Sequence, residues 1–189
     1  MADDDWPELG WADSAEAMTI ALTKDVSDVA VRSALVIDPE PGFRATFSEA
    51  LDRQDHAGDS YIVQVDQVGD WQVLIEPNGF LLSIQEICAP LSRDGQLIAA
   101  FWNVNSLMTF MFAVNGRVLR EFDPLLYAAG GDALPEEAGL PFGRHGRPRV
   151  ATLALILRMT GVTLTADWLL RKPRETLVSR FQLGTLTNQ

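Results

Sequence analysis

The 189-residue sequence holds one cysteine, Cys88, and two histidines, His56 and His145. A single cysteine excludes an intramolecular disulfide and fits a reducing compartment. So few histidines and cysteines give no zinc spacing, because zinc sites draw most of their ligands from these two residue types. Residues 55–59 (DHAGD) carry oxygens that suit a hard cation, but this composition is more typical of a turn. We therefore expect neither a bound metal nor a cofactor.

The sequence also lacks long apolar runs, internal repeats and a leader pattern. No stretch of about 18 apolar residues is present, so we expect no membrane span. The first ten residues (MADDDWPELG) are acidic, without the basic and then apolar order of a signal peptide. We expect residues 1–10 to form a flexible acidic tail and residues 11–189 to form a single α+β domain. The expected location is the cytoplasm.

Basic residues are scarce and unevenly placed. The chain has 15 Lys and Arg against 26 Asp and Glu, which gives a net charge of −11. Residues 1–143 hold 7 basic and 24 acidic side chains, giving −17, and residues 144–189 hold 8 basic and 2 acidic ones, giving +6. We expect no nucleic-acid binding, because duplex affinity rests largely on phosphate neutralisation. The basic section either packs against the acidic body, which we favour, or offers a patch to an anionic partner.

Alternating apolar residues and turn signals predict a sheet. Gly69–Asp70 suits a two-residue hairpin turn, and the resulting register places Val63 opposite Glu76. Asn115–Gly116 is a strong type I′ hairpin signal, which sets Phe110 opposite Glu121. The predicted strands are residues 16–24, 61–65, 71–77, 96–102, 107–114 and 117–122.

Helical patterns fall between and after these strands. The expected helices are residues 27–37 with Ser27 as N-cap, 44–54, 83–95 with a Ser83 and Glu86 capping box, 149–161 with Gly161 as C-terminal cap, and 165–172. Residues 124–148 are rich in Gly and Pro and form a long loop. The predicted fold class is α+β: a mainly antiparallel sheet of about five to six strands with helices packed on it, and two helices at the C-terminus.

Both faces of the predicted sheet are apolar. A four-residue loop over residues 103–106 would set Phe101 opposite Met108, and the side chains on either face are then almost all apolar. A sheet with one solvated face alternates more cleanly, so something covers each side. Helices 27–37 and 149–161 could cover one face. We favour cover from within the chain, and homo-oligomerisation is the alternative.

Carboxylates supply the first candidate site residues. Glu76 lies on an apolar strand face, where burial would raise its pKa and suit it to general acid or base chemistry. Its place before Pro77 also fits a solvated strand end. Glu121 and Asp123 share a face by period two and form a candidate carboxylate pair. They equally fit the solvated end of a hairpin strand, or partners for Arg117.

Amides and a basic loop supply the remaining candidates. Asn103 and Asn105 are either a ligand-reading pair or the turn between two strands, and we favour the turn because asparagine caps turns through its side chain. Arg144, His145 and Arg147 lie in a glycine-flanked loop just before a helix, which suits a phosphate or carboxylate. No phosphate-loop motif is present. The alternative is a surface loop that pairs with acidic residues such as Glu136 and Glu137.

Three segments resemble a known family. They are VGDWQVLIEPNGF (68–80), FWNVNSLMTFMFAVNGRVLREFDPLLY (101–127) and LPEEAGLPF (134–142). In the tryptophan strand ending in E-P-N-G, the N-V-N segment and the later aspartate–proline, the chain resembles an uncharacterised actinobacterial family, a domain of unknown function. The resemblance extends from about Trp11 to the helix around Trp168. It implies a one-domain bacterial protein and brings no assigned activity, cofactor or catalytic residue.

Two functions remain open. The first is a non-enzymatic binding or regulatory protein, immunity-like or antitoxin-like, whose acidic body masks a basic protein surface. The second is a small hydrolase that uses Glu76, or Glu121 with Asp123, together with the loop that carries Arg144 and His145. We favour the binding protein because no nucleophile, metal or cofactor constellation emerges from the sequence.

Overall fold

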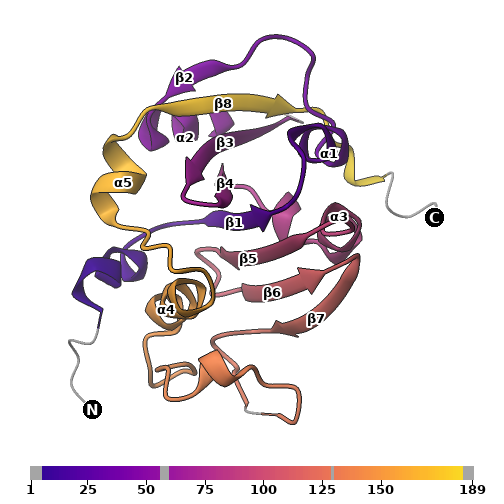
Figure 1. The fold of residues 1–189 in the computed structure, drawn as a ribbon. Helices are drawn as coiled ribbons and strands as arrows, with labels where there is room; N and C mark the ends of the chain where they lie inside the picture. The colour runs from indigo at the N-terminus through magenta and orange to yellow at the C-terminus, as the bar shows by residue number, and fades with distance from the viewer. Residues whose placement is uncertain (1–5, 56–59, 129, 185–189) are drawn as a thin grey trace.

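One eight-stranded antiparallel sheet runs through the chain, in the order β2-β8-β3-β4-β1-β5-β6-β7 (Figure 1). The computed structural model describes residues 6–55, 60–128 and 130–184. The strands are β1 (Met18–Lys24), β2 (Phe43–Ala45), β3 (Tyr61–Val68), β4 (Trp71–Pro77), β5 (Gln96–Trp102), β6 (Met108–Val114), β7 (Arg117–Phe122) and β8 (Arg174–Ser179).

Short helices connect these strands. They are the α-helices α1 (Asp28–Ala34), α2 (Phe47–Asp55), α3 (Gln85–Leu91), α4 (Pro148–Thr160) and α5 (Ala166–Arg171), and the 3-10 helices η1 (Pro7–Asp13), η2 (Leu81–Ser83) and η3 (Pro135–Glu137). Two of the predicted caps are confirmed: Ser27 Oγ accepts from the Ala30 N–H at 3.1 Å, and Gly161 ends α4 with a φ of 73°. Among the described residues, no helix has the length and apolar character needed to cross a membrane.

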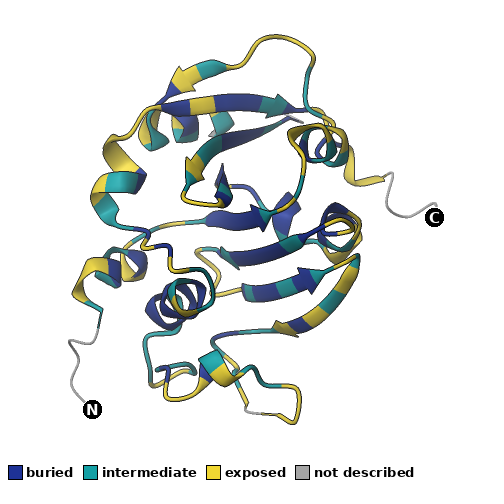
Figure 2. Ribbon diagram, in the orientation of Figure 1, coloured by how far each residue is buried: buried dark blue, intermediate teal, exposed yellow. Residues whose placement is uncertain are grey.

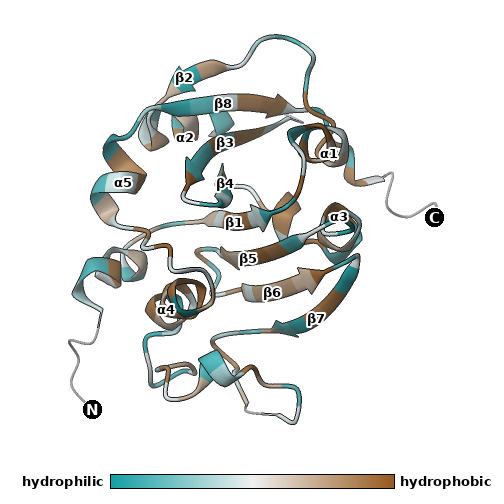
Figure 3. Cartoon of the chain, in the orientation of Figure 1, coloured by the Kyte–Doolittle hydropathy of each residue, from teal (hydrophilic) through white to brown (hydrophobic). Residues whose placement is uncertain are grey.

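Both faces of the sheet are covered by the chain itself, which explains why both are apolar. One core cluster joins side chains of η1, α4 and α5 to β1, β5 and β6. The other joins α1, η2 and α3 to the opposite faces of the same strands. The central strands are accordingly buried and apolar (Figures 2 and 3). The predicted pairing of helices 27–37 and 149–161 on one face is wrong, because α1 and α4 lie in different clusters.

The predicted count of five to six strands is also wrong, because β2 and β8 were missed. Strand β2 has three residues, too few for a period of two to show. Strand β8 follows the two predicted C-terminal helices and begins with Arg174–Glu175, which resembles a solvated helix end. It nevertheless pairs with both β2 and β3. The C-terminal helices therefore lead back into the sheet.

Two register predictions fail by one residue. A bulge between β6 and β7 places Phe110 opposite Phe122, so Glu121 pairs with Met111 instead. The loop after β5 includes Leu107, which is 59% exposed, and the strands therefore pair through Trp102 and Met108. A one-residue shift moves a side chain to the other face of the sheet, so faces assigned from sequence were reversed here. The register of β3 with β4 is as predicted.

Part of the segment predicted as an acidic tail, residues 1–10, lies in a helix. Pro7–Asp13 forms η1, and Leu9 within it is fully buried in the core. The proline fits the first turn of a helix, where its missing N–H costs no hydrogen bond. Residues 7–10 therefore belong to the folded body.

The predicted capping box at the start of α3 does not form. The helix begins at Gln85 with Ile84 in the N-cap position, and no side chain caps it. Ser83 instead closes η2, donating from its hydroxyl to the Phe80 carbonyl at 2.7 Å. Ser83 therefore belongs to the 3-10 helix that precedes α3 and does not cap α3.

The long loop after β7 is held by a buried ion pair. Arg120, whose side chain is 5% exposed, donates to Glu137 through Nε at 2.8 Å and through Nη2 at 3.0 Å. Its Nη1 donates to Asp132 at 2.9 Å. These bonds and the stacked rings of Tyr127 and Phe142, 4.7 Å apart, fix the loop against the edge of the sheet.

A strained residue after α1 gives a stability prediction. Val36 has a φ of 49°, a left-handed conformation that costs β-branched residues most. Its side chain is 48% exposed, so little packing is lost on substitution. We expect Val36→Asn to raise the free energy of unfolding by about 1 kcal/mol, since asparagine tolerates this region. Urea denaturation measures the effect.

The matched control is Val29→Asn. Val29 lies in α1 and is 76% exposed, so the same exchange removes a similar side chain from ordinary helical backbone. It should leave stability unchanged or slightly lower. If both variants lose stability to the same extent, the left-handed conformation of Val36 stores no appreciable strain.

Candidate functional site

Glu76 is buried inside the core. It is fully inaccessible to solvent, and its carboxylate accepts from the backbone N–H groups of Leu81 at 3.1 Å and Leu82 at 2.8 Å. Burial raises the pKa of Glu76 to about 7, although the two backbone hydrogen bonds oppose the shift. The raised pKa agrees with the prediction, but the carboxylate faces η2 rather than an open pocket.

The two asparagines form a turn. Asn103 accepts through Oδ1 from the N–H groups of Asn105 at 2.9 Å and Leu107 at 3.1 Å. Asn105 is exposed at the tip of this turn. The side chain of Asn103 therefore bonds within its own loop, as expected for the turn that we favour.

The two carboxylates of the predicted pair have different surroundings. Asp123 accepts through Oδ1 from the N–H groups of Leu125 at 2.8 Å and Leu126 at 3.3 Å, closing the bend after β7. Glu121 is exposed on β7, which is an edge strand of the sheet. Only one of the two carboxylates is thus free to act on a ligand.

The basic loop before α4 pairs with a different element from the one expected. Arg147 donates through Nε to Asp13 of η1 at 2.8 Å, whereas Glu137 is occupied by Arg120. Arg144 and His145 are exposed. The loop therefore ties the N-terminal helix to α4.

The sequence candidates do not converge on one place. Glu76 lies in the core, Asn103 and Asp123 close separate turns, and Arg147 forms a surface ion pair. Within residues 6–55, 60–128 and 130–184, no group of three or more His, Cys, Asp or Glu is placed to hold a metal. Residues 56–59, including His56, lie outside the described residues.

Cys88 is not arranged as a nucleophile. The thiol is fully buried and donates to the Leu82 carbonyl at 3.1 Å. Burial raises its pKa, and the nearby charge of Glu76 raises it further. A thiol held neutral and away from solvent is inert, because the thiolate is the reactive form.

An apolar cavity opens between η1, the start of β1, α2 and α5. It has a volume of about 210 Å³. We call it the α5 cavity. Its apolar walls are Trp11, Met18, Phe47, Leu51, Leu169 and Leu170. Ser14 and Glu16 line it as well and are exposed, so they mark its mouth. Concave apolar sites with a few polar groups are the usual form of a binding pocket.

Hydrogen bonds from distant segments hold one wall. Trp11 donates through Nε1 to the carbonyl of Leu164, just before α5, at 2.7 Å. Arg149 of α4 donates through Nη1 to the carbonyl of Ala15 at 2.5 Å and to that of Ala12 at 3.4 Å. These bonds fix the segment that carries Ser14 and Glu16.

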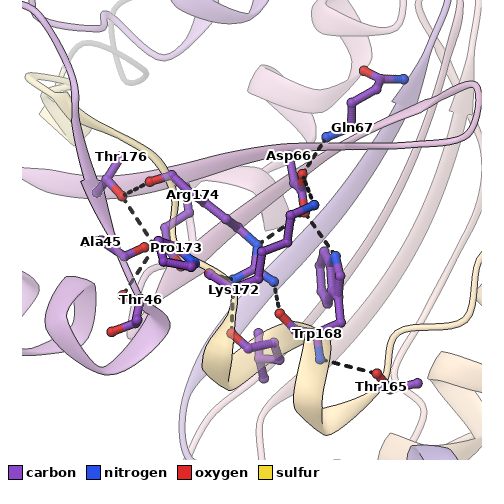
Figure 4. Close-up of polar contacts among 12 residues, drawn as sticks. Ala45, Thr46, Asp66, Gln67, Thr165, Trp168, Lys172, Pro173, Arg174 and Thr176 are labelled. Carbon is purple, nitrogen blue, oxygen red and sulfur yellow. Dashed lines mark hydrogen bonds and ion pairs between the residues drawn. The ribbon is translucent and has the colours of Figure 1, made fainter.

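The α5 wall is held by a cluster of charged side chains around Asp66 of β3 (Figure 4). Asp66 accepts through Oδ2 from Trp168 Nε1 at 2.9 Å and through Oδ1 from Lys172 Nζ at 2.7 Å. Arg174 is completely buried and donates through Nη1 to the carbonyl of Leu169 at 2.9 Å, and also donates to that of Trp168. The guanidinium lies 4.1 Å from the Trp168 ring. We call Asp66, Trp168, Lys172 and Arg174 the Asp66 cluster.

The charges in this cluster stabilise one another. Burial tends to raise the pKa of Asp66, but the hydrogen bond from Lys172, the Gln67 N–H and the charge of Arg174 outweigh it and hold the pKa below its usual value. Burial lowers the pKa of Arg174, and the charge of Asp66 opposes that shift. Arg174 Nε lies 3.4 Å from Asp66 Oδ2, an ion pair without a formed hydrogen bond.

A polar recess of about 270 Å³ lies on the outer side of the Asp66 cluster. Its charged groups are largely paired within the chain: Lys172 with Asp66 at 2.7 Å, and Glu175 with Arg32 at 2.9 Å. Internal pairing leaves less charge for a ligand here than the composition suggests. The α5 cavity is therefore the better candidate site.

Neither the α5 cavity nor the Asp66 cluster can be recognised in the sequence. Trp11 and Trp168 fit general core packing, and nothing in the sequence connects Asp66 with Arg174, which is 108 positions away. The link depends on β8 pairing beside β3. A prediction that included β8 would have brought the two residues together.

Comparison with known proteins gives a family and no activity. Residues 2–185 match the model described as "Family of unknown function (DUF6461)". No match was found among curated proteins, and none among solved structures.

Proposed function

The chain belongs to the family of unknown function (DUF6461), which it matches over residues 2–185, so we propose its function from the site. We propose that it is a non-enzymatic binding or regulatory protein that receives a partner at the α5 cavity. An immunity-like or antitoxin-like role suits such a small acidic protein. We also propose a cytoplasmic location, which the single cysteine favours, and an actinobacterial host, which the sequence resemblance implies.

The cavity itself is the observation that carries this proposal. It is apolar and opens to solvent beside Leu170, a leucine that is 49% exposed. An exposed apolar surface that continues into a hollow is typical of an interaction site or a ligand-binding groove. The hydrolase alternative has less support, because Glu76 is enclosed, Asp123 closes a turn and Arg147 is paired with Asp13.

Affinity capture from the native host tests the proposal. The tagged chain and its Leu170→Lys and Leu126→Lys variants are compared by quantitative mass spectrometry. We expect a protein that the parent chain retains and Leu170→Lys loses by about tenfold, since one anchor contact is worth 1–2 kcal/mol. Leu126 is 57% exposed and lies on the loop after β7, away from the cavity lining. Leu126→Lys should therefore retain the same partner.

Two results would overturn the proposal. One is equal retention of every captured protein by Leu170→Lys and the parent chain. The other is turnover in a screen of ester, peptide and phosphate substrates that Glu121→Gln or His145→Gln abolishes. The circular dichroism spectra of all variants are compared first, so that a folding defect is recognised.

A further inference from the structure

We propose that the occupant of the α5 cavity is a basic segment of a partner protein, which inserts an apolar side chain into the cavity and places a neighbouring lysine or arginine beside Glu16. This inference rests on the proposed binding function and specifies the chemistry of the partner.

Glu16 gives the charge preference. Glu16 lines the cavity mouth, and its carboxylate forms no hydrogen bond or ion pair with any residue that the structure describes. Neighbouring carboxylates are already paired: Asp13 with Arg147 at 2.8 Å and Asp167 with Arg171 at 3.0 Å. An unpaired carboxylate beside an apolar wall favours a ligand that carries a cation next to an apolar group.

The size of the cavity limits the apolar part. A cavity of about 150 Å³ lined by leucine, isoleucine and phenylalanine side chains holds benzene. The α5 cavity, at about 210 Å³, therefore has room for one phenylalanine, leucine or methionine side chain. Trp11 and Phe47 line it, and aromatic rings pack well against either an aromatic or a sulfur-containing anchor.

The charge of the whole chain acts in the same direction. The net charge is −11, and the walls from η1, β1 and α2 belong to the acidic part of the sequence, whereas the α5 wall belongs to residues 144–189, which carry +6. Such a field attracts a basic partner and raises the association rate, with a strong dependence on salt. The net charge of the chain disfavours the approach of an acidic partner.

Three short peptides serve as probes of the full chain: acetyl-KKFKK-amide, acetyl-EEFEE-amide and acetyl-KKAKK-amide. Binding is followed by NMR at low salt through the Trp11 indole and the methyl groups of Leu169 and Leu170. We expect the basic phenylalanine peptide to shift these signals at about tenfold lower concentration than either other peptide. Loss of binding with KKAKK shows that the apolar side chain is needed, and loss with EEFEE shows that the charge is.

Matched charge reversals then assign the effect to Glu16. Glu16→Lys should weaken binding of the basic peptide about tenfold, the loss expected from removing an attraction and adding a repulsion. Glu86→Lys makes the same change in net charge on α3, which covers the other face of the sheet, and should have little effect.

Several outcomes would overturn the inference: equal binding of the acidic peptide, equal effects of the two reversals, or no shift of the cavity signals by any peptide. The proposed function is judged separately, because capture through Leu170 assumes no partner charge. A captured partner that Leu170→Lys loses and Glu16→Lys retains would keep the function and reject the basic segment.

Discussion

Replacing Arg174 by glutamine is expected to lower the free energy of unfolding by about 3–5 kcal/mol, as for other buried ion pairs that lose one partner. The substitution removes a guanidinium that is completely buried and bonded to the carbonyls of Trp168 and Leu169. It leaves those carbonyls without their donor and removes a positive charge 3.4 Å from the Asp66 carboxylate. Each unpaired buried polar group adds its own desolvation cost.

The same loss should loosen the α5 wall of the cavity. Leu169 and Leu170 line the cavity, and Arg174 holds the carbonyl of Leu169 at 2.9 Å. Hydrogen exchange of the α5 amides should therefore accelerate more than that of α4, because the carbonyls that Arg174 bonds belong to α5. Urea denaturation followed by circular dichroism gives the global loss of stability, and exchange gives its location.

Arg171→Gln is the control for this change. Arg171 is three positions earlier, its side chain is 84% exposed, and it pairs with Asp167, which is 78% exposed. Exposed pairs of this kind are worth less than about 1 kcal/mol. Asp66→Asn completes a double-mutant cycle with Arg174→Gln, and a coupling below about 0.5 kcal/mol would show that the two side chains contribute independently.

The sequence was sufficient for the parts of the fold set by local signals. Ser27 and Gly161 mark helix ends because their capping chemistry is local, and both act as predicted. Asn115 and Gly116, with φ of 50° and 78°, form the hairpin turn that their residue types favour. The strands on either side of these signals were placed to within two residues.

Long-range contacts were beyond the sequence. The bulge that shifts Glu121 out of register with Phe110 could not be placed from the sequence, because residues 117–122 (RVLREF) do not alternate and so favour no single register. Strand β8 is stabilised by pairing with β2 and β3. Its apolar and polar residues alternate too weakly to predict a strand from sequence. The errors therefore concentrate where tertiary pairing decides.

The candidate site shows the same division. Glu76 was singled out because a carboxylate on an apolar face is unusual, and its raised pKa follows from burial alone. Trp11, Leu51 and Leu169 are ordinary apolar residues, and they become a cavity only when η1, α2 and α5 meet. A sequence can show that one residue is unusual for its position. It cannot show a cavity that forms only when the fold brings several ordinary apolar residues together.

Substituting Glu76 by glutamine is expected to remove a pH-dependent loss of stability of about 3 kcal/mol. The variant should therefore become more stable relative to the parental chain as the pH rises. The carboxyl has a pKa near 4.5 in the unfolded chain and about 7 in the folded one. Between these values the folded state keeps a proton that the unfolded state has released, so rising pH favours unfolding. A shift of about 2.5 pH units corresponds to about 3 kcal/mol. The parental chain loses this stability between pH 4.5 and 7. Above pH 7 the contribution of Glu76 to the free energy of unfolding no longer changes with pH.

Glutamine removes the titration but keeps the shape of the side chain. It offers one carbonyl oxygen to the N–H groups of Leu81 and Leu82, so below pH 4.5 the variant should be the less stable protein by about 1 kcal/mol. As the parental carboxylate ionises in its buried position, this difference should shrink and then reverse by about pH 7. Urea denaturation of both proteins from pH 4 to 8 measures the difference directly, and carboxylates common to both, such as Asp66 and Glu137, cancel in it.

Glu86→Gln provides the comparison on the same side of the sheet. Glu86 is exposed at the start of α3, so the exchange removes a charge without changing a buried one. Its stability difference from the parent should stay within about 0.5 kcal/mol at every pH, as for most surface substitutions. A flat difference for Glu76→Gln as well would mean that the two backbone N–H groups stabilise the buried carboxylate as well as water does, and that Glu76 is a permanently charged cap of η2 rather than a group that titrates near neutral pH.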